Sequence, residues 1–207
     1  MLDDIRPLID SASYTYIRQR EMKGLGHAIL TGWVGDETFA VILADDLCVN
    51  EDQGVSAQMV ELYKQFRCSI VAVQEVPETE THKYGVIAGE MIKDDIFRID
   101  NMVEKPEPGT APSNLAIIGR YILTPDIFEL IENTEPGKGG EIQITDALMK
   151  QAQSGCVLAY KFKGHRFDCG SVEGYIEATN YCYENLYKKA SSAELAKKPT
   201  VKVAEPA

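Results

Sequence analysis

Apolar and polar positions follow two different periods along this chain. The largely apolar runs Phe39–Ala44, Ser69–Val73 and Leu115–Ile122 have the length and β-branched content of buried strands. Ser56–Phe66, between the first two runs, has apolar residues at helical spacing. Strand, helix and strand in that order predict a right-handed βαβ unit. The pattern therefore predicts an α/β fold in which Phe39–Ala44 is a buried strand of a parallel sheet.

The remaining segments predict shorter strands and helices. Tyr14–Ile17 is aromatic and β-branched and predicts a short strand, whereas Met1–Ser13 is polar and predicts no element. Lys23–Ala28 predicts a glycine turn that opens a helix. Further strands are expected at Tyr84–Ala88, Ile96–Ile99, Met102–Val103 and Val157–Phe162, and further helices at Pro125–Ile131, Glu141–Gln153 and Ser171–Tyr187.

Composition narrows the class of protein. The 207 residues suffice for one sizeable α/β domain, and a formal net charge of -11 argues against nucleic acid as a partner. No apolar run approaches the length of a membrane span, so no membrane association is expected. The five cysteines lack CxxC spacing and are expected to be free thiols in a reducing compartment, which makes the cytoplasm the expected location.

Two adjacent acids, Asp45 and Asp46, follow the run Phe39–Ala44 directly. Ligands of open α/β sheets bind beyond the carboxyl ends of the strands, and carboxylate oxygens bind hard cations such as Mg²⁺. Aspartate also commonly ends a strand in a turn, where it makes local hydrogen bonds. The residues alone leave both readings open, with Asp45 as the candidate metal ligand.

Glu104 and Lys105 form a second candidate, in the segment Val103-Glu104-Lys105-Pro106. Glu104 can accept hydrogen bonds from sugar hydroxyls, and Lys105 can neutralise a phosphate. Neighbouring side chains on an extended segment point to opposite faces, and Pro106 favours extended geometry for Lys105. Both side chains can face one ligand only if the chain bends, and the alternative is a solvated pair before a loop.

Asp168 lies on the glycine turn Phe167–Gly170, ahead of the predicted helix. Taken alone it more often caps such a helix, but it can also meet Asp45 across a cleft and complete a metal site. Gln19 and Gly24 can read the edge of a pyrimidine, since glutamine offers a donor and an acceptor and glycine allows close approach, but taken alone they indicate only a surface loop. Gly85 lies either against a ligand or in a strand bulge.

The order of these segments along the chain indicates a protein family more specifically than any single segment does. Taken together they resemble the family of bacterial UTP–glucose-1-phosphate uridylyltransferases, also called UDP-glucose pyrophosphorylases, over about residues 1–187. The segments are Gln19 with Gly24-Leu-Gly-His27, Leu43-Ala-Asp45-Asp46, Tyr84-Gly85, Val103–Pro106, Pro112-Ser-Asn-Leu-Ala116, Gly140-Glu-Ile-Gln-Ile-Thr-Asp146 and Phe167–Gly170.

The resemblance implies a Rossmann-like mixed sheet with helices on both faces, of the nucleotide-diphospho-sugar transferase type. It implies transfer of uridylyl from UTP to glucose 1-phosphate, giving UDP-glucose and pyrophosphate with Mg²⁺, in a homo-oligomer. Asp45 and Asp168 would bind Mg²⁺, and Gln19 and Gly24 would contact uracil. The sugar hydroxyls would meet Gly85 and Glu104, and the sugar phosphate would meet Lys105, so that Asp45, Lys105 and Asp168 form the catalytic set.

The family also begins with a Gly-x-Gly-Thr-Arg loop that wraps the triphosphate, and no such segment occurs in this sequence. We therefore expect the first strand and helix of the nucleotide-binding half to be missing. The expected organisation is an N-terminally incomplete nucleotidyltransferase domain at 1–187 and a flexible tail at 188–207. The alternative to an active enzyme is an inactive remnant that binds sugar nucleotide or assembles with a full-length partner.

Overall fold

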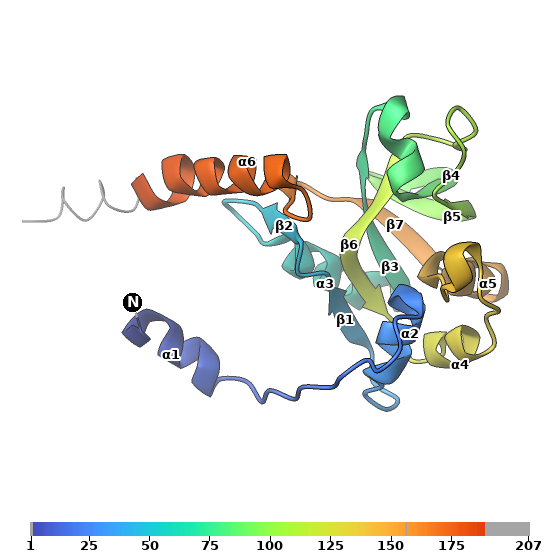
Figure 1. The fold of residues 1–207 in the computed structure, drawn as a ribbon, viewed down its shortest axis with the longest axis horizontal. Helices are drawn as coiled ribbons and strands as arrows, with labels where there is room; N and C mark the ends of the chain where they lie inside the picture. Colours follow the sequence, from blue (N-terminus) through green and yellow to red (C-terminus); the bar gives the residue numbers. More distant parts are fainter. Residues whose placement is uncertain (1, 156, 189–207) are drawn as a thin grey trace, which may run out of the picture.

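A six-stranded mixed sheet organises the computed structural model, which describes residues 2–155 and 157–188 (Figure 1). The strand order is β1-β6-β3-β7-β5-β4, and β4 also pairs with the start of β6. Only the β3–β7 pair is parallel, and every other pair is antiparallel. The strands are β1 Phe39–Ile42, β3 Ser69–Glu75, β4 Gly85–Lys93, β5 Ile96–Glu104, β6 Leu115–Leu123 and β7 Val157–Lys161.

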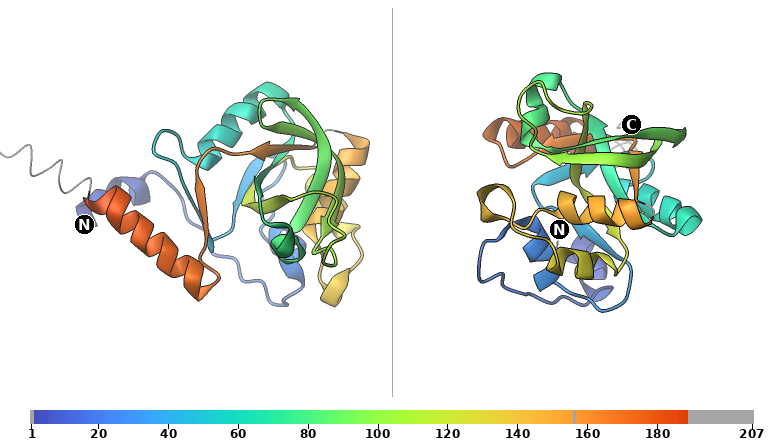
Figure 2. Two further views of the ribbon diagram at one scale, coloured as in Figure 1. Left: turned by 90° about the horizontal axis from the view of Figure 1, so that it is seen from above. Right: turned by 90° about the vertical axis from the view of Figure 1, so that its right-hand side faces the viewer.

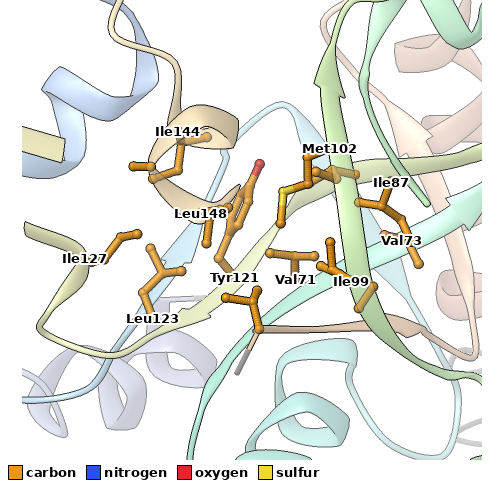
Figure 3. Close-up of a cluster of buried hydrophobic side chains, with 14 of the residues drawn as sticks. Val71, Val73, Ile87, Ile99, Met102, Tyr121, Leu123, Ile127, Ile144 and Leu148 are labelled. Carbon is orange, nitrogen blue, oxygen red and sulfur yellow. The ribbon is translucent and has the colours of Figure 1, made fainter. Parts of the chain in front are cut away.

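Helices cover both faces of this sheet because its central strands are apolar on both sides. On β3, Val71 and Val73 pack with one cluster, while Ile70 and Ala72 pack with the other. The first cluster includes Leu148 of α5 (Ile144–Ser154), Ile127 of α4 (Ile127–Glu132) and Ile29 of α2 (Gly24–Thr31) (Figure 3). The second includes Met59 of α3 (Val55–Phe66). The expected mixed α/β fold with helices on both faces is therefore confirmed.

A small second sheet pairs β2 (Asp46–Val49) with β8 (His165–Asp168) in antiparallel register. Asp46 lies opposite Asp168 in this register. The helix α6 (Val172–Cys182) follows β8, continues as a π-helical turn at Tyr183–Tyr187, and extends away from the main sheet (Figures 1 and 2). The small sheet thus joins the end of β1 to the start of α6.

The expectation of a buried, parallel strand at Phe39–Ala44 is wrong. β1 is an edge strand that pairs antiparallel with β6, and Ile42 is 57 % exposed. β1 and β3 run in the same direction, since both oppose β6, but β6 lies between them. An apolar run shows that side chains can be buried, but the residues of β6 that pair with β1 lie 78 to 84 positions further along the chain (120 − 42 and 123 − 39).

Two expectations at the beginning of the chain also fail. Residues expected to lack structure form the helix α1 (Leu2–Asp10), with Ile5 and Ile9 one turn apart on one face and both exposed. The expected strand Tyr14–Ile17 forms no ladder and lies in the extended segment between α1 and α2 (Figure 1). A strand needs a hydrogen-bonding neighbour, and β-propensity alone does not supply one.

The other predicted elements are present, within a few residues of their expected limits. The segments Ile96–Ile99 and Met102–Val103 are one strand, β5, which forms a hairpin with β4. Two 3₁₀ turns lie at Glu78–Lys83 and Lys138–Gly140. Cys48, Cys169 and Cys182 are free thiols, as expected, while Cys156 and the predicted tail beyond Lys188 lie outside the described residues. Within the described ranges, no helix is long and apolar enough to span a membrane.

Candidate active site

A cavity of about 330 Å³ is lined by residues of β4, β5, β6 and β8, by the turn after β1 and by the start of α5. Its wall includes five of the residues predicted from sequence: Asp45, Gly85, Glu104, Lys105 and Asp168. These residues come from positions 45 to 168 of the chain, so the fold brings them together from separate segments. The structure therefore places most of the predicted site around one cavity.

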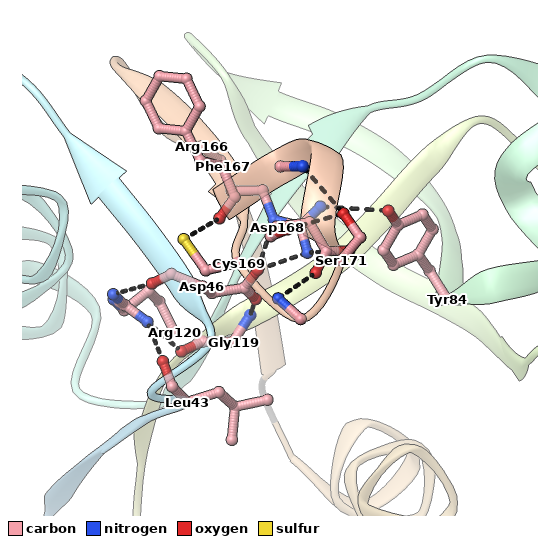
Figure 4. Close-up of polar contacts among 12 residues, drawn as sticks. Leu43, Asp46, Tyr84, Gly119, Arg120, Arg166, Phe167, Asp168, Cys169 and Ser171 are labelled. Carbon is pink, nitrogen blue, oxygen red and sulfur yellow. Dashed lines mark hydrogen bonds and ion pairs between the residues drawn. The ribbon is translucent and has the colours of Figure 1, made fainter. Parts of the chain in front are cut away.

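The two adjacent acids have different environments. Asp45 is exposed, whereas Asp46 is buried. The Asp46 carboxylate accepts a hydrogen bond from the backbone N–H of Gly119 at 2.5 Å and one from Nε of Arg166 at 2.5 Å (Figure 4). A buried carboxylate with these partners is satisfied by the protein itself, so Asp46 has a structural role and only Asp45 is available to a ligand.

Gly119 makes this arrangement possible. A Cβ at position 119 would lie 2.5 Å from Cβ of Leu43 and 2.7 Å from Oδ2 of Asp46, so any larger residue would separate β6 from the turn after β1. Arg120, the next residue, donates to the carbonyls of Leu43 at 3.0 Å and Asp46 (Figure 4). The turn that carries Asp45 is therefore held to β6 by backbone and side-chain hydrogen bonds.

Asp168 does not cap α6, contrary to the commoner reading of its position. The cap is Ser171, whose Oγ accepts a hydrogen bond from the N–H of Gly174 at 3.1 Å. Asp168 instead accepts the N–H of Gly170 at 3.1 Å through Oδ1. A Cβ at Gly170 would lie 3.1 Å from Oδ1 of Asp168 and 3.3 Å from Oδ2 of Asp45, so the two carboxylates face the same point.

The bend required at Glu104 and Lys105 is present. Lys105 has φ +44°, a left-handed conformation that is unfavourable for a residue before proline, and its N–H donates to the carbonyl of Tyr84 at 3.0 Å. The expectation of extended geometry at Lys105 is therefore wrong, and the side chains of Glu104 and Lys105 both line the cavity. Their charged atoms lie 3.8 Å apart, and Gly85 is the cross-strand neighbour of Glu104.

Burial affects the protonation of this part of the wall. Burial is the largest influence on Glu104 and raises the pKa of its carboxyl, although Lys105 and a hydrogen bond from Thr145 act in the opposite direction. Burial, and then the charge of Glu104, also raise the pKa of the Tyr121 hydroxyl far above its ordinary value. Tyr121 stands in the core with its hydroxyl at the cavity, so it is a neutral donor and acceptor at neutral pH (Figure 3).

Gln19 and Gly24 lie together but are not among the residues that line the cavity. The Gln19 amide donates to the carbonyl of Gly24 at 3.2 Å and lies 2.8 Å from Nδ1 of His27. The segment that follows binds to Ile142 through the N–H of Gly26 at 3.0 Å. The pair is therefore held beside the wall formed by Leu25 and Glu141.

Several residues that line the cavity were not assigned a role from the sequence. Arg166 is the most connected of them: besides Asp46, it donates to the hydroxyl of Tyr84 at 3.1 Å and lies 3.3 Å from Asp168. The sequence did contain a signal for Arg166. It stands two positions before the candidate ligand Asp168, and on a strand both side chains then share one face. The others are Lys83, Tyr84, Tyr121, Glu141, Gln143 and Thr145.

The charges around the cavity fit a divalent cation together with a phosphorylated ligand. Five carboxylates and three cationic side chains line it, and the Asp46–Arg166 pair neutralises itself. Among the described residues no group of three or more His, Cys, Asp or Glu side chains can hold a metal. Two carboxylates suffice for Mg²⁺, which keeps several waters and binds substrate phosphates. The residues therefore fit this ion at Asp45 and Asp168.

Fold and site together define an α/β domain whose acidic cavity can hold a cation and a phosphorylated ligand. The family model described as nucleotidyl transferase matches residues 6–185, and the chain therefore belongs to the nucleotidyl transferase family.

Individual relatives place the chain more narrowly. It is 79% identical over 187 residues to a Pseudomonas aeruginosa protein named UTP–glucose-1-phosphate uridylyltransferase, covering 89% of this chain and 67% of that protein. A Bacillus subtilis protein of the same name is 45% identical over 181 residues, covering 86% of this chain and 62% of that protein. A UDP-glucose pyrophosphorylase solved with UDP-glucose superposes with a TM-score of 0.86 at 58% identity, covering 88% of this chain and 70% of that one. The chain thus spans about two-thirds of these relatives.

The raised pKa of Glu104 predicts a pH-dependent gain in stability on substitution. The folded-state pKa lies above the ordinary value, so the folded protein keeps this proton longer and loses stability as pH rises through that interval. We expect Glu104→Gln to have a larger free energy of unfolding than the wild type at pH 7.5. At pH 4, below the ordinary pKa of a glutamate carboxyl, the two proteins should differ less. Urea unfolding at both pH values measures this, and a difference that is the same at both would contradict it.

Proposed function

We propose that this protein transfers uridylyl from UTP to glucose 1-phosphate, giving UDP-glucose and pyrophosphate. The single observation that carries the proposal is the convergence of Asp45, Asp168, Glu104 and Lys105 on one cavity, in a chain 79% identical to a relative named for this reaction. A phosphate oxygen of the sugar phosphate would bond to the α-phosphorus of UTP, and the bond from that phosphorus to the pyrophosphate oxygen would break. No side chain needs to act as a covalent nucleophile.

The side chains would act by position and charge. Lys105 would bind the sugar phosphate, because its bent backbone directs the ammonium into the cavity beside Glu104. Glu104 would accept hydrogen bonds from sugar hydroxyls, and Gly85 opposite it would contact the sugar through its backbone, since a Cβ at position 85 would lie 3.0 Å from Oε2 of Glu104. Gln19 and Gly24 would contact uracil, and their mutual hydrogen bond supports a shared role.

Mg²⁺ would be held by Asp45 and Asp168, whose oxygens face one point near Gly170. When bound, the ion would neutralise charge on the phosphates and orient them for in-line displacement. The remaining polar groups of the wall would hold the sugar in place through hydrogen bonds. The surrounding excess of carboxylates supports a need for such an ion, because phosphates alone would be repelled.

The cellular location and the oligomeric state of the protein are also proposals. Cys48, Cys169 and Cys182 are free thiols and support a reducing compartment, for which we propose the cytoplasm. We further propose a homo-oligomer. Exposed apolar side chains on one helix, Tyr175 and Ile176 of α6, support it, because association would remove them from water.

Pyrophosphate release from UTP and glucose 1-phosphate with Mg²⁺ tests the proposed reaction. We would assay the 207-residue chain and a chimera that joins it to the remaining segments of the 79% identical Pseudomonas aeruginosa relative. We expect turnover by the chimera; activity confined to the chimera would assign part of UTP binding to those segments. No turnover by either protein, with UDP-glucose binding retained, would contradict transfer and favour a binding protein.

The two proposed metal ligands predict loss of turnover without loss of the fold. In the chimera, Asp45→Asn and Asp168→Asn should each lower kcat about 100-fold or more at fixed Mg²⁺, because a neutral amide binds the cation poorly. Both side chains reach solvent, so thermal stability should change little. Asp36→Asn, at an exposed loop position, is the matched control. Wild-type kcat in either site variant would remove that residue from the metal site.

The proposed phosphate contact predicts an effect on substrate affinity. Lys105→Ala should raise KM for glucose 1-phosphate about 10–100-fold, the range for a lost hydrogen bond to a charged group. Lys64→Ala on α3, where the lysine pairs with Glu61 on the surface, should leave KM unchanged. An unchanged KM in Lys105→Ala would show that this ammonium does not bind the sugar phosphate.

A further inference from the structure

Arg166 lies between two carboxylates that have different surroundings. Its side chain is 9% exposed, that of Asp46 is 7% exposed and that of Asp168 is 41% exposed. Arg166 and Asp168 are two residues apart on β8 and share a face, and Asp46 is opposite Asp168 on β2. The guanidinium thus links a buried acid of the core to a partly exposed acid of the cavity.

The guanidinium itself has little freedom. Asp46, to which Nε donates at 2.5 Å, is fixed by the backbone N–H of Gly119. Nη1 donates to the Tyr84 hydroxyl at 3.1 Å, and the guanidinium carbon lies 5.3 Å from the centre of the Tyr84 ring (Figure 4). Because guanidinium is planar, these contacts also set the direction of Nη2, which pairs with Oδ1 of Asp46 and lies 3.3 Å from Oδ2 of Asp168.

Asp168 is consequently held through both of its oxygens. Oδ2 faces Arg166, and Oδ1 accepts the N–H of Gly170 and faces the point shared with Asp45. Like charges directly opposite each other on antiparallel strands repel. Without a cation between them, Asp46 and Asp168 would therefore move apart, and the Asp168 carboxylate would be free to rotate.

We propose that Arg166 is a positioning residue: it holds the Asp168 carboxylate in the orientation from which Asp168 and Asp45 bind a divalent cation, and Tyr84 fixes the guanidinium. This inference rests on the metal site of the proposed function. Tyr84 also binds the N–H of Lys105 through its carbonyl at 3.0 Å. The same residue thus connects the proposed phosphate-binding side of the cavity with the proposed metal-binding side.

The choice of substitution matters because Arg166 acts in two opposing ways. Its positive charge repels a bound cation, while its hydrogen-bonding geometry prepares the carboxylate that binds it. Removing the charge would therefore strengthen cation binding by ending the repulsion and weaken it by releasing the carboxylate. Arg166→Lys keeps the charge but loses the planar fork that reaches Asp46, Tyr84 and Asp168 at once. Tyr84→Phe keeps every charge and the ring, and removes one hydrogen bond.

Mn²⁺ binding, measured by electron paramagnetic resonance on the full chain without nucleotide, tests the proposal. We expect Arg166→Lys to raise the Kd for Mn²⁺ about 10–100-fold, the range seen when the groups that orient metal ligands are removed. Tyr84→Phe should raise it about 2–10-fold, the effect of one hydrogen bond. Arg67→Lys is the matched control, since Arg67 also lies over a tyrosine ring, at 5.5 Å from that of Tyr63, but far from the cavity wall.

Each outcome separates positioning from simple structural support. A lower Tm with an unchanged Kd in Arg166→Lys would overturn the proposal, because a purely structural ion pair affects only the Tm. If Arg166→Lys does not fold, Tyr84→Phe decides in the same way, since it keeps the Arg166–Asp46 pair. No Mn²⁺ binding by the wild type would overturn the metal site as well as this inference, whereas pyrophosphate release tests the reaction separately.

Discussion

The buried ion pair between Asp46 and Arg166 is the interaction on which the site depends. It connects β2 to β8, and the hydrogen bond from Gly119 connects the pair to β6 in the main sheet. Removing one partner of such a pair typically costs about 3–5 kcal/mol, because the other charge stays buried without compensation. The turn that carries Asp45 and the strand β8 that carries Asp168 are therefore held in place by contacts with the core.

This constraint separates the roles of two neighbouring acids. Asp46 is neutralised inside the protein, whereas Asp45 lines the cavity and forms no ion pair with the other described residues. The backbone bend at Lys105 achieves a similar result on the opposite wall, where it brings an acid and a base to one cavity. A buried carboxylate at Asp46 and a left-handed backbone at Lys105 are each unfavourable alone. Contacts with neighbouring strands stabilise both.

The sequence predicted most helices and strands, and it predicted five residues that line the cavity. These predictions succeeded because they depended on the local spacing of apolar residues and on the order of the motifs along the chain. The sequence did not predict the antiparallel edge position of β1, since its partner β6 lies far along the chain. Nor did it predict the β2–β8 sheet, whose strands have four residues each, or the roles of Arg166 and Tyr84, which depend on contacts 82 to 120 residues apart.

Anomalous X-ray scattering from Mn²⁺ in crystals of the chain would test the central claim most directly. The account predicts one peak within bonding distance of Asp45 and Asp168, with Asp46 still bound to Arg166 and the Gly119 N–H. A peak coordinated by Asp46, with Arg166 displaced, would contradict the division of roles between the two adjacent acids.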